Sequence, residues 1–290
     1  EPVISVVVEA KSSSEQDKMI QALQKLEKED PSCKLKTDPE TGQILLYGMG
    51  ELHLEILLDR LFRKFKISVN KGKPQVSYRE AISSSAESTH IFEKNIAGDD
   101  LYASVTVKVE PIDYDKTVEF KNSVQLNKEF NDLMVRAIEN GFREGAEVGI
   151  LAGFSMLGVK MTLQRVDYRK ENMSEIAFKA STMLAFKEAV SKCQSHILEP
   201  IFKVEVISPE DFIGSVVSDL NSRRGKINSI EIKNSGSQVI HAEVPLAELF
   251  GYATDVRSLS QGRATFSMEF FHYAPVPQKT ANEILNSIGR

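Results

Sequence analysis

The chain has 290 residues, of which 41% are hydrophobic and 27% are charged, and its formal net charge is −5 at pH 7. This length allows two or three domains, and no apolar run approaches the roughly 20 residues of a membrane-spanning helix. Basic and acidic residues balance along the chain, for example 12 against 12 in residues 1–78. Nucleic-acid binding by bulk charge is therefore disfavoured, and any RNA contact needs a focused basic patch.

The start of the chain and its cysteines bear on its origin. The sequence begins EPVISVVVEA, without an initiating Met or the basic segment of a signal peptide, so we expect a fragment of a longer protein. Cys33 and Cys193 are its two cysteines. Because they are far apart in sequence, we expect reduced thiols in a cytoplasmic protein and neither a disulfide nor a metal site.

The first 76 residues alternate strand and helix patterns. An apolar strand is expected at 3–10 and an amphipathic helix at 14–29. Two short strands around the turn DPETG (38–42), a second helix that includes Leu54 and Phe65, and a last strand, KISV, complete the unit. The order strand, helix, strand, strand, helix, strand predicts a split βαβ domain over 1–76.

Residues 77–198 follow a different plan. We expect three strands, a helix at about 128–144, another strand and a second helix from Ser174. The strands are expected at 90–96, 101–109, 117–122 and 156–163. The glycines at 141, 145, 149 and 153 are expected to break the chain before the last strand, and the polar stretch 164–172 is expected to be a loop.

Residues 199–290 repeat the first plan. Strands are expected at 202–207, 226–232, 238–244 and 263–271, with two intervening helices. SPED (208–211) is a helix start, and Gly225 and Gly262 are expected to stop helices. The sequence therefore predicts an α+β protein in which split βαβ domains at 1–76 and 199–290 flank an unlike domain at 77–198.

The sequence contains no motif for catalysis or metal binding. It lacks a GxxxxGK[ST] loop, a nucleophile elbow and a CxxC pair. His53 lies between Glu51 and Glu55, but side chains two positions apart on a helix point in different directions. We therefore expect no enzyme activity, no cofactor and no metal in these 290 residues.

A candidate RNA-binding patch lies at the end of the helix that precedes Gly225. Arg223 and Arg224, followed by Lys226, present guanidinium forks that match phosphate geometry. The alternative is pairing with the helix dipole at a solvated surface. The segment GYATDVRSLSQGR (251–263) adds Arg257 and Arg263, either as phosphate contacts where backbone approaches another surface closely or as ordinary surface charges.

Two expected loops of the middle domain carry the other candidates. The first would be a basic finger with one aromatic ring, able to bind RNA by charge and stacking: Arg165, Tyr168, Arg169 and Lys170. Its alternative is a solvated loop. The second contains Asp99 and Asp100, which would repel phosphate or contact a basic protein. Its alternative, which we favour, is a polar turn.

Six segments resemble, in order, the last three domains (III, IV and V) of bacterial elongation factor G. They are DPETGQILLYGMGELHLEILLDRL (38–61), KGKPQVSYREAI (71–82), SEIAFKASTMLAFKEA (174–189), LEPIFKVEV (198–206), SDLNSRRGKI (218–227) and AEVPLAELFGYATDVRSLSQGRATFSMEFFHY (242–273). The resemblance implies ferredoxin-like first and last domains and a middle domain like the second domain of ribosomal protein S5. It also implies an upstream GTPase domain, absent here, that would bind GTP and Mg²⁺.

The resemblance further implies the partners. The last domain would bind large-subunit ribosomal RNA, and the tip of the middle domain would reach the decoding region of the small subunit. Ribosome recycling factor would be a further partner of a monomer that contacts no membrane. Such a chain would act in translocation, in ribosome recycling or in both.

The tip loops depart from the family pattern. AGDDLYASV (97–105) stands where the family has a sequence like GGRGQYGHV, and QRVDYRKENMSE (164–175) places Arg169 where the family has a histidine. We therefore interpret the chain as part of a divergent paralogue, of the elongation factor G 2 type, in which recycling is favoured over translocation.

Two other classes of protein fit the sequence less well. An acylphosphatase-like enzyme would need an arginine in the loop after the first strand, where this chain has KSSS (11–14) and SPED (208–211). A free-standing regulatory or RNA-binding protein of paired ferredoxin-like modules is disfavoured by the missing Met and by the middle domain.

Overall fold

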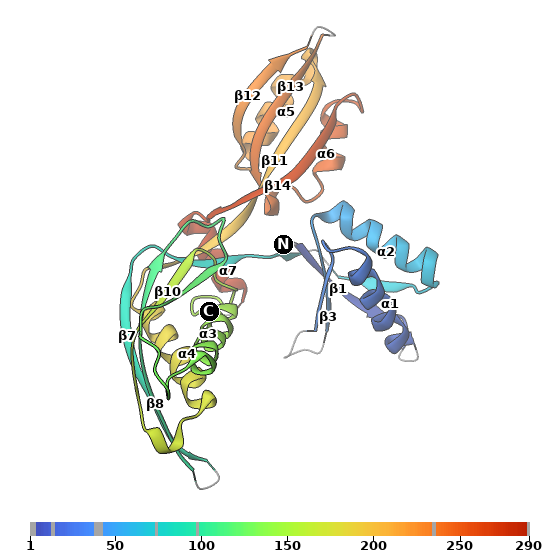
Figure 1. The fold of residues 1–290 in the computed structure, drawn as a ribbon. Coiled ribbons are helices and arrows are strands. Elements are labelled where there is room, and N and C mark those ends of the chain that lie inside the picture. The colour runs from blue at the N-terminus through green and yellow to red at the C-terminus, as the bar shows by residue number, and fades with distance from the viewer. Residues whose placement is uncertain are drawn as a thin grey trace. The chain divides into compact units, whose positions relative to one another are not determined.

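The computed structural model describes residues 4–12, 15–37, 43–72, 75–96, 99–233 and 236–288. The chain divides into two units by its internal contacts, residues 1–77 with 199–272 and residues 78–198 with 273–290. Figure 1 shows its helices and strands, coloured along the chain. The chain therefore passes from one unit to the other after residues 77, 198 and 272. The turn expected at 38–42 lies outside the described residues.

The first sheet has the strand order β2-β3-β1-β4, with the short β5 also pairing with β1. Its strands are β1 (Ile4–Ala10), β2 (Lys34–Thr37), β3 (Ile44–Gly48), β4 (Val69–Lys71) and β5 (Gln75–Val76). Helices α1 (Gln16–Glu29) and α2 (Glu51–Phe65) pack against it. Alternate residues of β1 and one stripe of each helix are buried, as their period-2 and period-3.6 patterns predict.

The sheet of the second unit has the order β7-β8-β10-β9. Its strands are β7 (Ala86–Ile96), β8 (Asp99–Pro111), β9 (Val118–Asn122) and β10 (Val159–Tyr168). β8 pairs antiparallel with β7 and β10, and β9 is parallel to β10. Helices α3 (Asp132–Glu147) and α4 (Glu175–Ser191) complete the core, and a 3-10 turn, η2 (Lys170–Asn172), precedes α4.

The segment 164–172, expected as a loop, is a strand for residues 164–168, and β8 begins at Asp99, two residues before its expected start at 101. β8 and β10 pair with each other as far as Ala103 and Tyr168. The strands continue because every second side chain reaches the core, for example Val105 and Val166. Polar residues on the other face hid this alternation in the sequence.

The glycines expected to break the chain after the first long helix of this unit do not all do so. Gly141 and Gly145 lie inside α3, on its buried face. A Cβ atom at Gly141 would lie 2.4 Å from the carbonyl oxygen of Lys179 in α4. These glycines therefore let the two helices pack closely.

The third sheet, β12-β13-β11-β14, repeats the strand order of the first. Its strands are β11 (Ser195–Pro209), β12 (Lys226–Ile232), β13 (Ser237–Pro245) and β14 (Thr265–Pro275). Helices α5 (Glu210–Ser222) and α6 (Tyr252–Leu259) are joined to it, and a 3-10 turn, η3 (Leu246–Glu248), follows β13. Two βαββαβ arrangements of this order make the first and third sheets ferredoxin-like, so the α+β prediction is confirmed.

Strand β11 begins at Ser195, seven residues before the expected start. Its first residues, Ser195–Leu198, pair with β6 (Arg79–Ile82) in the second unit. Its later residues, Ile201–Pro209, pair with β13 in the first unit. One uninterrupted strand thus belongs to both units.

The last helix, α7 (Gln278–Ser287), was not expected from the sequence. Ile284 of this helix and Val276 form a small buried cluster with Ile197, against which Tyr78 and Phe154 pack. Residues 273–290 accordingly belong to the second unit. Among the described residues, no helix has both the length and the apolar character needed to cross a membrane.

Candidate nucleic-acid interface

The end of α5 presents the first candidate residues. The N–H of Gly225 donates to the carbonyl of Leu220 at 2.8 Å, and the N–H of Arg224 donates to that of Asn221 at 3.1 Å. These two bonds form a Schellman motif, whose left-handed residue is Arg224 with φ 60°. Gly225 was expected to be the residue that stops the helix. Its lack of a side chain is needed for close packing instead, because a Cβ atom there would lie 2.5 Å from the Leu220 oxygen.

The guanidinium of Arg223 is occupied by neighbours in its own domain. Its Nε donates to Asp219 at 2.8 Å, one Nη donates to the carbonyl of Glu248 at 2.6 Å, and the other donates to Asp255 at 2.5 Å. The group also lies 5.0 Å from the centre of the Tyr252 ring. Partial burial alone would lower the pKa of Arg223, but the two carboxylates raise it.

Arg224 is held in a similar way. Its guanidinium binds both carboxylate oxygens of Glu199, a side chain that is only 2% exposed, and lies 3.6 Å from Glu248. These contacts match neither a free RNA-binding patch nor the expected alternative of a solvated surface paired with the helix dipole, because both guanidinium groups pair with carboxylates of the same domain. An RNA contact by either residue stays a prediction.

Three other cations of this domain are more available. Lys226 begins β12, Arg257 lies on α6, and Arg263 precedes β14 with its guanidinium 5.6 Å from the Phe212 ring centre. All three are exposed, and none forms an ion pair with a described residue. The N–H of Gly262 donates to the carbonyl of Arg257, so Arg257 and Arg263 flank one turn.

In the second unit, the residues expected to form a basic finger are divided between a strand and a turn. Arg165 is exposed on β10, opposite Thr106 of β8. Tyr168 is half-buried, and its ring lies 6.3 Å from that of Phe130 and 6.2 Å from that of Phe178. The Tyr168 ring therefore packs against the core, and its stacking on a base stays a prediction.

Arg169 and Lys170 lie at the end of β10 and form exposed ion pairs. Arg169 Nη2 lies 2.7 Å from Glu93, and its guanidinium is 4.6 Å from the centre of the Tyr102 ring. Lys170 Nζ lies 3.0 Å from Glu129, and this hydrogen bond raises the pKa of Lys170. Exposed pairs of this kind contribute little to stability, so both cations can exchange partners.

The acidic candidates begin β8. Asp99 pairs with Ile96 and Asp100 pairs with Asn95, where β7 and β8 meet. The Asp100 carboxylate accepts a hydrogen bond of 2.6 Å from Asn95 Nδ2. Arg169, just after β10, contacts Glu93 of β7 and Tyr102 of β8. The end of β10 therefore lies against the β7–β8 hairpin that carries the acidic pair. The preferred interpretation of the acidic pair as a polar turn falls partly on residues 97–98, outside those described.

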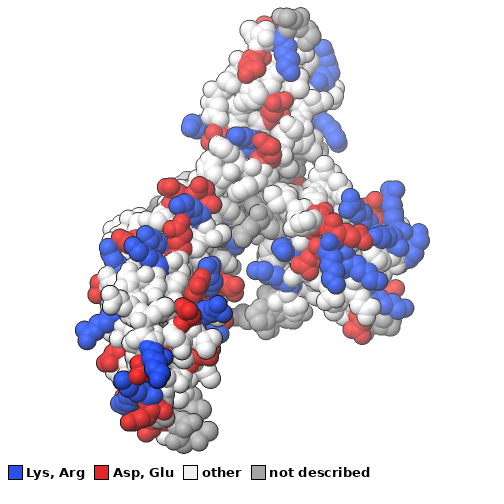
Figure 2. Space-filling view, viewed as in Figure 1, with Lys and Arg blue, Asp and Glu red and all other residues white. Residues whose placement is uncertain are grey.

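The surface charges are mixed over the molecule. In the view of Figure 2, basic and acidic side chains are interspersed over the surface of each unit. In the described part of the chain, no cluster of His, Cys, Asp or Glu could hold a metal ion. His53 instead accepts the Met49 N–H at 3.0 Å and lies 3.1 Å from Asp30, which joins α2 to the end of α1.

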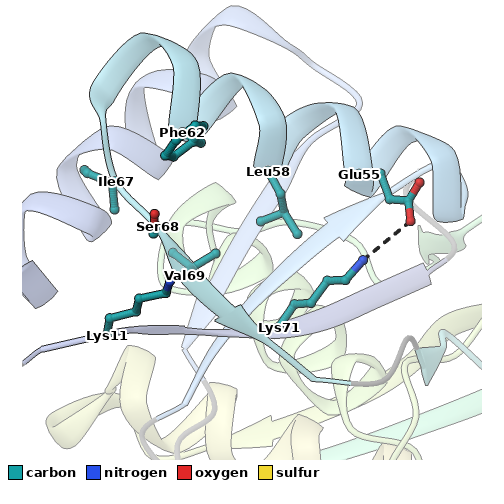
Figure 3. A pocket seen from close by; sticks show the side chains of 8 residues that line it. All are labelled: Lys11, Glu55, Leu58, Phe62, Ile67, Ser68, Val69 and Lys71. Carbon is teal, nitrogen blue, oxygen red and sulfur yellow. Dashed lines mark hydrogen bonds and ion pairs between the residues drawn. The ribbon is translucent and has the colours of Figure 1, made fainter.

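An open groove between α2 and β4 was not expected from the sequence. It has a volume of about 450 Å³ and is lined by Lys11, Glu55, Leu58, Phe62, Ile67, Ser68, Val69 and Lys71. We call it the α2–β4 groove (Figure 3). Phe62 is the residue that could have indicated this groove, because it is a large apolar side chain outside the buried stripe of α2. It is 53% exposed.

Comparison with known proteins covers nearly the whole chain. Family models match in order: Elongation Factor G, domain III, over residues 1–73, Elongation factor G, domain IV, over 74–194, and Elongation factor G C-terminus over 196–284. A relative in Bdellovibrio bacteriovorus, Elongation factor G 1, is 60% identical over all 290 residues, which are 41% of its length.

A solved structure has a similar fold. A crystal structure of a protein from Thermus thermophilus is 35% identical, with a TM-score of 0.78, over 100% of this chain and 43% of its own. The chain thus spans less than half the length of both relatives. The interpretation as a second, divergent paralogue finds no support in these matches.

Proposed function

Since the chain belongs to the elongation factor G family, over domain III, domain IV and the C-terminal domain, we propose that it is the ribosome-directed arm of a translational GTPase. The single observation that carries this proposal is the collinear match of three domain models along residues 1–284. The arm would act in the cytoplasm and convert GTP hydrolysis, in a domain outside these residues, into movement on the ribosome.

The 290 residues themselves should be inert toward GTP. They contain no phosphate-cradling loop of the P-loop type and no Mg²⁺-binding motif that accompanies one. Saturable GTP binding to the purified chain would contradict this proposal.

The C-terminal domain would hold large-subunit ribosomal RNA through Lys226, Arg257 and Arg263. These cations are exposed and not paired with described carboxylates, whereas Arg223 and Arg224 are held by acidic neighbours. Binding to phosphate releases counterions, so the affinity should fall with rising salt. Arg223 and Arg224 would then act mainly by shaping the surface beside these three cations.

A salt series on the intact factor tests this assignment. Arg257→Ala combined with Arg263→Ala should weaken ribosome binding and reduce the slope of log K against log salt by about 1 per lost contact. Lys18→Ala, an exposed cation of α1, is the matched control and should leave the slope unchanged. An unaltered slope in the double variant would remove these arginines from the interface.

The tip of domain IV would favour ribosome recycling, with ribosome recycling factor as a partner, over translocation. Asp99 and Asp100 would lie near RNA phosphates, and each carboxylate is repelled by about 1 kcal/mol at about 4 Å in water. Translocation requires the tip to hold the codon–anticodon helix, whereas splitting a spent ribosome places no such demand on the tip.

Exchange of the tip segments tests the preference. Residues 97–105 and 164–172 would be replaced by the family's usual sequences in the intact factor, and messenger RNA movement and subunit splitting would be measured. The exchange should speed movement more than it affects splitting. If the unaltered factor already moves messenger RNA at the ordinary rate and fails to split post-termination complexes, the recycling proposal is wrong.

A further inference from the structure

A fully buried carboxylate in the second unit is bound by main-chain N–H groups. Glu80 lies in β6 and is 0% exposed. One of its carboxylate oxygens accepts the N–H of Leu151 at 2.9 Å, and the other accepts those of Ala152 at 2.7 Å and Phe154 at 3.0 Å. Hydrogen bonds to a charged group are stronger than neutral ones, and a buried carboxylate without them is costly. Glu80 and the segment 151–154 therefore hold each other in place.

The main chain of Glu80 is tied to the same part of the chain. Its N–H donates to the carbonyl of Ser155 at 3.1 Å, and its carbonyl accepts the N–H of Leu157 at 2.8 Å. Gly149 lies against the carboxylate so closely that a Cβ atom there would overlap it. Neighbouring backbone N–H groups can form concavities that bind anions. The segment 149–157 wraps around Glu80 in this way, and the Glu80 carboxylate takes the place of a bound anion.

The residues that bind Glu80 through their N–H groups are also residues that contact the last helix. The side chains of Leu151, Ala152 and Phe154 pack against the small buried cluster that includes Ile284 of α7. We call these three side chains the α7 seat. The backbone of each residue fixes the direction of its side chain, so the hydrogen bonds to Glu80 also fix the shape of the α7 seat.

Strand β11 connects Glu80 to the same cluster by a second route. Ile197 is the partner of Glu80 where β6 and β11 pair, and directly opposite residues of an antiparallel pair share one face of the sheet. Ile197 belongs to the cluster, and its carbonyl accepts the N–H of Val276, just before α7, at 3.0 Å. Glu80 therefore adjoins both surfaces against which α7 packs, Ile197 and the α7 seat.

We propose that Glu80 is a positioning residue for α7, and that its carboxylate holds the segment 149–157 in the conformation that binds this helix. Without the carboxylate, three N–H groups lose their acceptor, the α7 seat changes shape, and α7 separates from it. The β7-β8-β10-β9 sheet has its own core with α3 and α4 and remains folded. α7 is thus a strap whose attachment depends on one carboxylate. This role lies beyond the proposed function, because none of the candidate RNA-binding residues takes part in it.

Two substitutions distinguish hydrogen bonding by Glu80 from simple filling of space. Glutamine has nearly the shape of glutamate, but an NH₂ donor replaces one of the two oxygens. Because both oxygens of Glu80 accept N–H groups, either orientation of the amide sets a donor against at least one of them. Aspartate is one CH₂ shorter but keeps both acceptors. Glutamine is the milder change if shape decides, and aspartate is the milder change if hydrogen bonding decides.

Hydrogen exchange of the 290-residue chain, measured residue by residue, tests the proposal. Glu80→Gln should raise the exchange rates of the α7 amides at 281–287 by about tenfold or more, whereas those of α4 at 179–191 should change by less than about threefold. Glu80→Asp should raise the α7 rates by less than Glu80→Gln does. Glu87→Gln, at an exposed position of β7, is the matched control and should leave the α7 rates unchanged.

Two further variants approach the same contact from its other partners. Gly149→Ala leaves Glu80 in the chain but places a Cβ atom against its carboxylate, so it should also raise the α7 exchange rates. Ile284→Ala weakens the docking of α7 directly. Because coupling between two sites is reciprocal, it should raise the exchange rates of the amides at 151, 152 and 154 by about threefold or more. Ile284→Ala also tests the coupling if Glu80→Gln does not fold.

Four results would overturn the proposal. The first is unchanged exchange of the α7 amides in Glu80→Gln. The second is an effect of Glu80→Asp as large as that of Glu80→Gln or larger, which would show that shape decides. The third is an equal rise in α4 and α7, which would assign Glu80 to the general stability of the unit. The fourth is unchanged exchange at 151, 152 and 154 in Ile284→Ala.

Discussion

At the residue scale, the pair of Arg224 and Glu199 shows why a surface arginine can be a structural residue. Glu199 is 2% exposed, and Arg224 is held in a left-handed conformation that is unfavourable for a residue with a side chain. The ion pair and the hydrogen bonds of the Schellman motif offset this cost. Arg224 therefore orders the end of α5 as well as neutralising a buried carboxylate.

Arg224→Ala should destabilise the C-terminal domain by about 3 kcal/mol or more, because it leaves Glu199 buried without its partner. Urea unfolding of the 290-residue chain measures the effect. Arg257→Ala, at an exposed position of the same domain, should change the free energy of unfolding by no more than about 0.5 kcal/mol.

Asp30 gives a prediction about pH. A hydrogen bond from the Ser32 hydroxyl, with a further contribution from His53, lowers the pKa of Asp30 from its ordinary value of 3.8, against the effect of partial burial. A carboxyl whose folded-state pKa is lowered stabilises the protein above its unfolded value, and this stabilisation is lost as the pH falls through the folded value.

Asp30→Asn tests this directly. The difference in unfolding free energy between the unaltered chain and the variant should be constant near pH 6 and should shrink below about pH 3.8. Chemical unfolding at closely spaced pH values measures it. A difference that stays constant down to about pH 2 would show that the Asp30 carboxylate is not stabilised by Ser32 and His53.

At the scale of elements, α3 and α4 depend on glycine for their close approach. Gly141→Ala places a Cβ atom 2.4 Å from the Lys179 carbonyl, so the helices must separate, and we expect a loss of about 1–3 kcal/mol. Gly214→Ala is the matched control, because Gly214 lies inside α5 with nothing within 4 Å of an added Cβ. Alanine should stabilise that helix by about 0.5–1 kcal/mol. Equal effects at both sites would contradict the close-packing argument.

The order of helices and strands in the first and last domains could be predicted from the sequence because each element buries one face. The strands at 3–10 and 226–232 and the helix at 14–29 appear within two residues of their expected places. The end of β10 was missed because Arg165 and Asp167 face solvent, and a polar run in sequence looks like a loop. The start of β11 was missed because burial on both faces removes the alternation that marks a strand.

The candidate interface was harder to predict from the sequence than the fold. The sequence identifies Arg223 and Arg224 as basic, but their acceptors Glu199 and Asp255 are 25 and 32 residues away in sequence. Only tertiary packing shows that these guanidinium groups are occupied. Tyr168 was likewise taken for an exposed ring because its partners Phe130 and Phe178 lie on other elements.

At the scale of the whole molecule, the second unit is completed by a segment distant in sequence. Removing residues 276–290 would delete Val276 and α7 while leaving β14 whole. The apolar surface of Ile197 and its neighbours would then face water, so residues 78–198 should exchange their amide hydrogens faster. The truncated chain should keep its protection in residues 1–72, and loss of protection there as well would indicate general unfolding.

Ile284→Ala tests the same cluster without truncation. Ile284 is 9% exposed and packs in the cluster with Ile197, so we expect a loss of about 2 kcal/mol or more from the second unit. Leu285 is the neighbouring helix position and only partly buried, so Leu285→Ala should cost less. Thermal unfolding combined with hydrogen exchange assigns the loss to one unit.

The placement of residues 273–290 in the second unit also affects how the protein folds during its synthesis. Synthesis proceeds from the N-terminus at about 5–20 residues per second, so the segment after residue 272 emerges roughly 5–20 s after residues 78–198. During that interval the apolar surface around Ile197 is uncovered and open to chaperones or to a neighbouring nascent chain. The second unit therefore cannot be completed until the whole of the first unit, which ends at residue 272, has been synthesised.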